Sequence, residues 1–242
     1  GGRLIVSADP ALTLVAGDHD NWTGTATHPD QGFAWLVLDL PAGSRYKLTD
    51  GLTWEADPWS RAYGHDQNGL MSMVAPATAH LERHFRVEGL GLGPRTVRVY
   101  LAAEPATHIL YAHDGQNLFD PTAPWGGWQL EPALPPAMMV VAIDNTAARF
   151  DEYTHVPDDL GSGSLGGLGD SYADLLEQAV RPLIAAHYGE PPSVGLMGSS
   201  LGGLISLHVA DRHPGSYDFA ASLSGTVGWG SIHPAAAEET II

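Results

Sequence analysis

The sequence has no cysteine among its 242 residues, which excludes disulfides, thiol nucleophiles and thiolate metal sites. Basic residues are also scarce, with 11 Lys and Arg against 28 Asp and Glu, and the formal net charge at pH 7 is -17. A surface of this sign repels phosphate backbones and anionic lipid, so we expect no nucleic acid partner. No run of 18 apolar residues occurs, so the sequence predicts no membrane-spanning helix. None of these features identifies the cellular compartment.

The composition is that of a folded chain with many turns, because 44% of the residues are hydrophobic and there are 29 Gly and 18 Pro. Residues 1–80 read as strands without a helical period. An apolar run at 32–40 is followed by the turn sequence PAGS, and Asp50-Gly51 is typical of a hairpin. We therefore predict a small all-β sandwich domain over residues 1–80.

Residues 81–242 alternate strands with helices, which predicts a mostly parallel sheet with helices on both faces. The first two strands form a hairpin whose turn we place at GLGP, residues 91–94. Apolar residues recur at intervals of three and four over 173–189, which predicts a helix with Asp170 or Ser171 as its N-cap. The expected architecture is an α/β domain behind the β domain.

Gly198-Ser199-Ser200-Leu201-Gly202 fits the pattern Gly-x-Ser-x-Gly, between an apolar strand and an apolar helix. A sharp strand-to-helix turn holds a serine hydroxyl clear of its neighbours, as nucleophilic attack requires. The same turn points the amide N–H of the next residue, Leu201, toward a developing oxyanion. The alternative is a glycine-rich turn without catalysis.

Another polar sequence, His113-Asp114-Gly115-Gln116-Asn117, follows a buried strand. In folds that carry a nucleophilic serine on such a strand-to-helix turn, a loop at this position supplies the second oxyanion amide. The alternative is that the loop only caps the strand. Together with GGW and LMGSSLGGLISLHVADRHP…FAASLSG, it resembles the Putative esterase (esterase D-like) family of α/β-hydrolases over residues 95–230. That family includes feruloyl, acetylxylan and enterochelin esterases and the antigen 85 mycolyltransferases.

The resemblance implies a role for five residues. Ser200 is the expected nucleophile, and the amides of Leu201 and Gln116 are the expected oxyanion hole. Asp114 and Trp128 are expected in the substrate pocket, although Trp128 can equally be a core or rim aromatic. Asp144-Asn145 and Arg149 follow a core strand and either line that pocket or cap the strand.

Residues 10–75 resemble an early-set, glycogen-binding-type β-sandwich, on the sequences GDHDNWTG, AWLVLDLPAGSRYKL and WEADPWSRAYGHDQNG. Four tryptophans in this region form either a sugar-stacking platform or the core of the sandwich: Trp22, Trp35, Trp54 and Trp59. Asp18-His19-Asp20 and His65-Asp66 lack zinc-type spacing and are interpreted as solvated loops, so we predict no metal and no cofactor.

The catalytic base is the missing part of the pattern, because a serine hydroxyl needs a histidine oriented by a carboxylate. In this fold the acid and the histidine follow the nucleophile. His208 points away on the next helix, His213 ends that helix, and His233 lies near the end of the sequence. We therefore expect the sheet to lack its last strands, and the base and acid to lie outside these residues.

The sequence as a whole predicts a serine carboxylic ester hydrolase that works through an acyl-enzyme on Ser200. Its substrate would be a small-molecule or polysaccharide-linked ester, such as a feruloyl or acetyl ester. The alternatives are a siderophore esterase, an acyltransferase, and a non-catalytic glycan-binding protein on an inactive esterase scaffold. The oligomeric state stays open.

Overall fold

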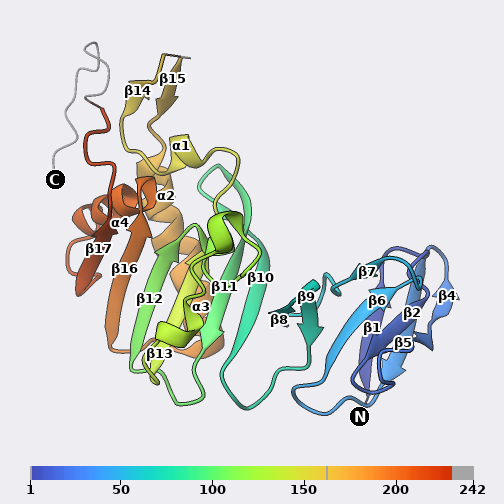
Figure 1. Cartoon of the computed structure of the whole chain (residues 1–242). Coiled ribbons are helices and arrows are strands. Elements are labelled where there is room, and N and C mark those ends of the chain that lie inside the picture. Colours follow the sequence, from blue (N-terminus) through green and yellow to red (C-terminus); the bar gives the residue numbers. More distant parts are fainter. Residues whose placement is uncertain (1, 162, 231–242) are drawn as a thin grey trace.

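The structure is a computed structural model that describes residues 2–161 and 163–230. In this part of the chain, a sheet of 12 strands runs from the C-terminal to the N-terminal half of the molecule (Figure 1). In order across the sheet, its strands are β17 (Phe219–Leu223), β16 (Ser193–Ser199), β12 (His108–His113), β13 (Met138–Ile143), β11 (Leu92–Leu101), β10 (His80–Gly89), β8 (Ala62–Asp66), β9 (Gly69–Met73), β6 (Arg45–Thr49), β2 (Leu14–Gly17) and β3 (Thr25–Ala26), with β7 (Trp54–Glu55) beside β6.

The C-terminal half of this sheet is parallel: β17, β16, β12 and β13 run in one direction, and β11 and β10 follow as an antiparallel pair. The helices are α1 (Arg149–Glu152), α2 (Gly169–Leu175), α3 (Arg181–Tyr188) and α4 (Leu201–Arg212), with 3-10 turns at Gly115–Asn117, Pro124–Gly126 and Glu131–Ala133. The predicted α/β architecture is confirmed.

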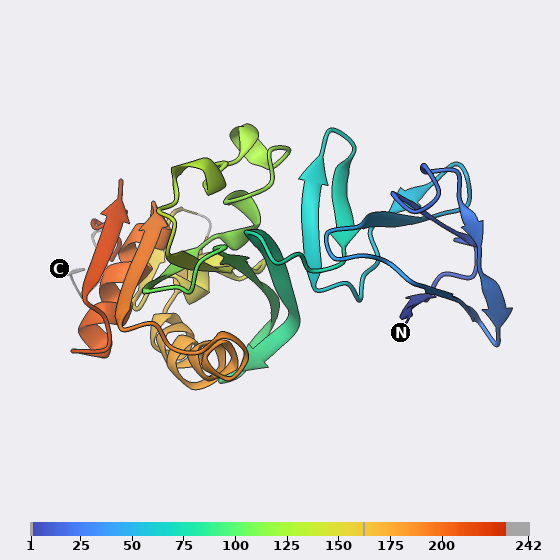
Figure 2. The ribbon, with the colours of Figure 1, turned by 90° about the horizontal axis from the view of Figure 1, so that it is seen from below.

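Both faces of the parallel strands are covered, because successive side chains of a strand point to opposite faces. Ile109 and Tyr111 of β12 pack in the same core as α2, α3 and α4, whereas Leu110 and Ala112 face the other way. That second face is covered by the loop with the 3-10 turns, which lies opposite the helices (Figure 2). This double burial explains why the strands are almost continuously apolar.

The helix predicted at 173–189 begins earlier and contains an irregular turn. It runs through α2, a π-helical segment at Leu176–Val180, and α3. Pro182 has no amide N–H to donate, which accounts for the altered bonding there. The predicted N-cap at Asp170 or Ser171 is wrong: Leu168 is the N-cap, because the amides of Leu168 and Gly169 donate to the carbonyls of Asp151 in α1 and of Thr154 just after it.

The turn between β10 and β11 also differs from its prediction. The two turn residues are Leu90 and Gly91, both with positive φ, and Gly89 pairs with Leu92. Such a two-residue turn matches the twist of the strands that it joins. Pro94 therefore lies inside β11.

The described part of the N-terminal half, residues 2–79, has strands and turns but no helix. A separate sheet of β1 (Arg3–Ser7), β5 (Phe33–Leu38) and β4 (His28–Asp30) shares a core with β2 and β6. The hairpin β14 (Pro157–Asp159) and β15 (Ser164–Gly166) lies beyond α1.

The two halves are joined where β8 pairs with β10, at Tyr63 with Leu81 and at Ala62 with Glu82. The predicted domain boundary between residues 80 and 81 falls at this junction and stays a prediction. Within the described residues, no helix combines the length and apolar character needed to cross a membrane.

Candidate active site

Ser200 occupies the sharp turn between β16 and α4. Its backbone has φ 57° and ψ -125°, a strained conformation for an L residue that costs of order 1–3 kcal/mol. A Cβ atom on Gly198 would lie 2.1 Å from the carbonyl oxygen of Gly202, so only glycine fits where the turn brings the strand and the helix together. The Ser200 side chain is exposed at the carboxyl edge of the sheet. The turn therefore presents a hydroxyl to solvent, as attack on a substrate requires.

The first turn of α4 places backbone N–H groups beside this hydroxyl. The amides of Gly203 and Leu204 donate to the Ser200 carbonyl at 3.0 and 3.1 Å, so helical bonding begins there. The preceding amides, including that of Leu201, have no acceptor within the helix. A helix N-terminus also favours negative charge. The amide of Leu201, the predicted oxyanion donor, therefore lies at the N-terminus of α4, directly after Ser200.

The loop after β12 lies at the same edge of the sheet. Asp114 has a left-handed backbone, with φ 60° and ψ 44°, and the 3-10 turn at Gly115–Asn117 follows it. A Cβ on Gly115 would lie 2.6 Å from the carbonyl carbon of Ala142, so the turn packs directly on β13. The side-chain oxygen of Gln116 accepts a 3.1 Å hydrogen bond from the amide of Asn145. These contacts hold the predicted second donor against β13 and the segment that follows it.

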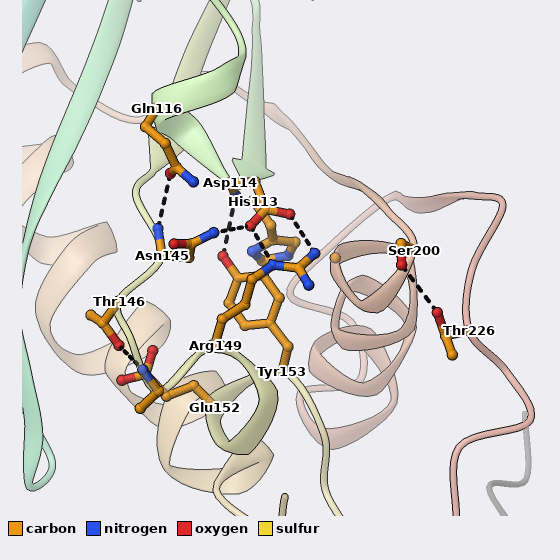
Figure 3. A network of polar contacts seen from close by, with 12 residues as sticks. His113, Asp114, Gln116, Asn145, Thr146, Arg149, Glu152, Tyr153, Ser200 and Thr226 are labelled. Carbon is orange, nitrogen blue, oxygen red and sulfur yellow. Dashed lines mark hydrogen bonds and ion pairs between the residues drawn. The ribbon is translucent and has the colours of Figure 1, made fainter. Parts of the chain in front are cut away.

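The Asp114 carboxylate is held by three charged or polar donors (Figure 3). Arg149 donates from Nε to Oδ1 at 2.7 Å and from Nη2 to Oδ2 at 2.8 Å, and Asn145 donates from Nδ2 to Oδ1 at 2.6 Å. An added Cβ on Gly202 would lie 3.2 Å from Oδ2, so the carboxylate also borders the first turn of α4. We call Asp114, Asn145 and Arg149 the carboxylate clamp. The clamp joins the loop of Gln116 to the segment after β13 and to α1, and it borders the first turn of α4.

A buried layer supports the clamp from below. The hydroxyl of Tyr153 accepts a hydrogen bond from the Asp114 amide, and His113 Nδ1 lies 2.8 Å from the hydroxyl of Tyr172. Burial lowers the pKa of His113 to about 4, so this imidazole is neutral at pH 7. Arg95 and Glu152 form a bidentate ion pair, with side chains 0% and 2% exposed, which fixes α1 to β11. Because α1 carries both Arg149 and Glu152, this pair positions the clamp.

The remaining predicted pocket residues lie around the same edge. The Trp128 amide donates to the carbonyl of Asn117 at 2.8 Å, and Trp128 is 40% exposed. Asp144 is bound by Arg98 in two hydrogen bonds of 2.7 and 2.9 Å. Burial raises the pKa of Asp144, and Arg98 opposes that rise. Asn145 and Arg149 therefore belong to the clamp, whereas Asp144 forms a neighbouring ion pair with Arg98.

The two described candidate histidines are engaged elsewhere. His208 Nε2 lies 2.9 Å from Asp170, and its ring stacks on that of His155. His213 pairs with Asp174 at 3.3 Å. His233 lies outside the described residues. Within residues 2–161 and 163–230, Thr226 is the only side chain that hydrogen-bonds the Ser200 hydroxyl, with 3.2 Å between the oxygens.

Sequence reasoning missed Thr226 and Tyr153, because neither belongs to a motif and each reaches the site only through the fold. In the described part of the chain, no group of three or more His, Asp or Glu side chains could hold a metal ion. Asp18 instead pairs with Arg45, and His65 lies 3.7 Å from Asp120.

Comparison with known proteins found a matching family model and a related protein sequence. A family model described as "Putative esterase" matches residues 93–239. The uncharacterized protein YbbA of Bacillus subtilis (strain 168) is 29% identical over 145 residues, which are 55% of this chain and 58% of YbbA.

Solved structures are similar at lower identity. The BES protein from Bacillus cereus has 16% identity and a TM-score of 0.51, over 62% of each chain. An enterochelin esterase from Shigella flexneri has 15% identity and a TM-score of 0.48, over 98% of this chain and 68% of that one. The chain therefore spans less than two thirds of the length of YbbA and of the BES protein. The likeness to the BES protein concerns the fold alone.

Proposed function

The chain belongs to the Putative esterase family, and on that basis we propose that it is a serine carboxylic ester hydrolase with Ser200 as the nucleophile. The observation that carries the proposal is the strained turn at Ser200, with φ 57° and ψ -125°. Structures keep such strain where a reactive group has to be held in one position. An exposed serine beside a helix N-terminus is suited to acyl transfer.

In the proposed reaction, Ser200 Oγ attacks the ester carbonyl and passes its proton to a histidine base. The carbonyl oxygen becomes an oxyanion, which accepts hydrogen bonds from the amides of Leu201 and Gln116. Collapse expels the alcohol and leaves an acyl-enzyme, which water hydrolyses to the acid and free Ser200. We place the base and its acid outside the described residues, because His208 and His213 are engaged with Asp170 and Asp174.

The test uses short p-nitrophenyl esters and a fluorophosphonate probe. We expect the protein to hydrolyse the esters and to take up one phosphonate, mapped to Ser200. Ser200→Ala should abolish both, and Ser199→Ala is the matched control within the same motif, expected to keep both. In a protein that includes the residues outside the described part, absence of turnover and of labelling would refute the hydrolase and favour the glycan-binding scaffold.

A cavity in the N-terminal half favours a substrate carried on a polysaccharide. Its volume is about 560 Å³, and it is lined by Trp22, Trp54, Arg45, Lys47, Asp66 and Asn68. The two indole rings lie 6.4 Å apart at 41°, and buried Lys47 donates to the carbonyl of Asn68. Aromatic faces with a few polar groups at their edge suit a hydroxyl-rich ring. We propose that this cavity binds a sugar of the substrate, such as a feruloylated or acetylated glycan.

The other two tryptophans lie outside this cavity. Trp35 packs on His28, with ring centroids 4.8 Å apart, and Trp59 is 68% exposed. We expect Trp54→Ala to reduce retention on insoluble glycans by at least tenfold, with Trp59→Ala as the control. An esterase that shows no retention, or equal retention in both variants, would remove the polysaccharide from the proposal and leave the ester hydrolase intact.

A further inference from the structure

The segment after β17 is attached to the nucleophile by its backbone as well as by a side chain. The amide of Ser200 donates to the carbonyl of Leu223 at 3.0 Å, and the amide of Thr226 donates to the carbonyl of Ser200 at 3.2 Å. Thr226 Oγ1 then lies 3.2 Å from Ser200 Oγ (Figure 3). Three contacts therefore determine where residues 224–230, which we call the strap, lie relative to the reacting hydroxyl.

The sequence of the strap is suited to this path. Ser224 has φ 50°, and a Cβ on Gly225 would lie 2.1 Å from the hydroxyl of Ser222. A Cβ on Gly203 in α4 would come within 3.1 Å of the Cα of Gly225. Gly203 is therefore needed where the strap crosses α4, and Gly225 where the strap passes Ser222. This path brings Thr226 beside the nucleophile.

The far end of the strap is anchored in the protein. Trp229 is 2% exposed, and its indole N–H donates to the carbonyl of Val156 at 2.8 Å. The amide of Gly230 donates to buried Asp158 at 2.9 Å, and the amide of Trp229 donates to the carbonyl of Thr226 at 3.2 Å. With both ends held, the backbone of Thr226 stays beside Ser200, within reach of its hydroxyl.

We propose that Thr226 is a further catalytic residue, whose hydroxyl donates a hydrogen bond to Ser200 Oγ; this rests on the proposed role of Ser200. A donor on Oγ leaves the serine proton free to point toward a base. If Ser200 donated to Thr226 instead, the serine proton would point at the Thr226 hydroxyl, which is too weak a base to take it up. During attack the Oγ–carbon bond forms, the Oγ–H bond breaks and the proton goes to the base, while Thr226 keeps its own.

The effect should appear in turnover and not in binding. Charge on Oγ is larger in the transition state than in the resting serine, and a hydrogen bond to a charged oxygen is the stronger one. The Thr226 hydroxyl also donates to one lone pair of Ser200 Oγ, and this hydrogen bond restricts the rotamers of the Ser200 side chain. Stabilisation that is realised only in the transition state raises kcat and leaves KM unchanged.

The experiment compares Thr226→Val with Thr226→Ser in the whole protein. Valine keeps the branched shape without the hydroxyl, and we expect kcat for p-nitrophenyl esters to fall roughly 10- to 100-fold with KM within about threefold. Serine restores the hydroxyl and should bring kcat back to within about threefold. Val227→Ala, at a half-exposed neighbour in the strap, should leave kcat unchanged.

Melting curves and fluorophosphonate labelling separate the possible failures. If Thr226→Val melts more than a few degrees lower, Thr226→Ala replaces it under the same criteria. A Thr226→Val protein with unchanged kcat, or a Thr226→Ser protein as slow as the valine variant, would overturn the role of Thr226. Failure of the unmodified protein to label at Ser200 would instead overturn the proposed function.

Discussion

Replacement of Arg95 by methionine tests whether the candidate site depends on the buried ion pair beneath it. Arg95 Nη1 and Nη2 bind the two oxygens of Glu152 at 2.8 and 2.9 Å, and both side chains are excluded from solvent. Without Arg95, the Glu152 carboxylate would be buried without its cation. Breaking such a pair costs about 3–5 kcal/mol.

The assay is urea and thermal unfolding at pH 7. A chain of this length loses roughly 2–4 °C of Tm per kcal/mol, so Arg95→Met should melt roughly 6–20 °C lower. Arg212→Met is the control, because the pair of Arg212 with Asp174 is solvent-exposed and is expected to contribute about 0–1 kcal/mol. Esterase activity of Arg95→Met should fall as well, because Glu152 lies on the same short helix as Arg149.

A double variant, Arg95→Met with Glu152→Met, decides the physical cause. Removing both charges leaves no desolvated ion, so most of the lost stability should return. A single variant that loses less than about 1 kcal/mol, or a double variant that loses the sum of the two single losses, would refute the account of a buried charge left unpaired.

Three further predictions concern the turn, the clamp and the pH dependence. Gly198→Ala should give little folded protein, judged by circular dichroism, because the new Cβ would lie 2.1 Å from a backbone oxygen; a stable, active variant would contradict this. Arg149→Lys should lower kcat/KM at least tenfold at near-normal Tm, because lysine cannot replace the bidentate contact with Asp114; full activity would exclude a positioning role. Since the folded pKa of His113 is about 4, below its ordinary value of 6.5, the unfolded chain binds more protons between these pH values. The free energy of unfolding should therefore fall as pH drops from 6.5 toward 4, and His113→Gln should flatten the denaturant-measured slope; an unchanged slope would refute this.

Local steric requirements explain which parts of the fold and of the candidate site could be predicted from the sequence. The turn around Ser200 needs small residues on both sides and an apolar strand and helix beside it, and all of these are neighbours in the chain. The loop of Gln116 was predictable because it follows a buried strand, and the carboxyl ends of parallel strands meet at one edge. The strands themselves were visible as apolar runs.

Other features depend on distant residues and were missed or misplaced. The helix begins at Gly169 and not near Ala173, because the carbonyls of Asp151 and Thr154 accept hydrogen bonds from the amides of Leu168 and Gly169. The turn of the first hairpin lies at Leu90 and Gly91, where two adjacent residues adopt positive φ, and not at the proline. Propensity alone did not distinguish these outcomes.

The sequence by itself determined the alternation of strands and helices, the sharp strand-to-helix turn at Ser200 and the loop of Gln116, because each follows from the sterics and hydrophobicity of adjacent residues. Only the tertiary structure decided that Arg149 binds Asp114 and that Thr226 lies beside Ser200. These pairs are 35 and 26 residues apart in the chain. A hydrogen bond between such residues depends on how the sheet and its helices pack, and no local pattern records that packing.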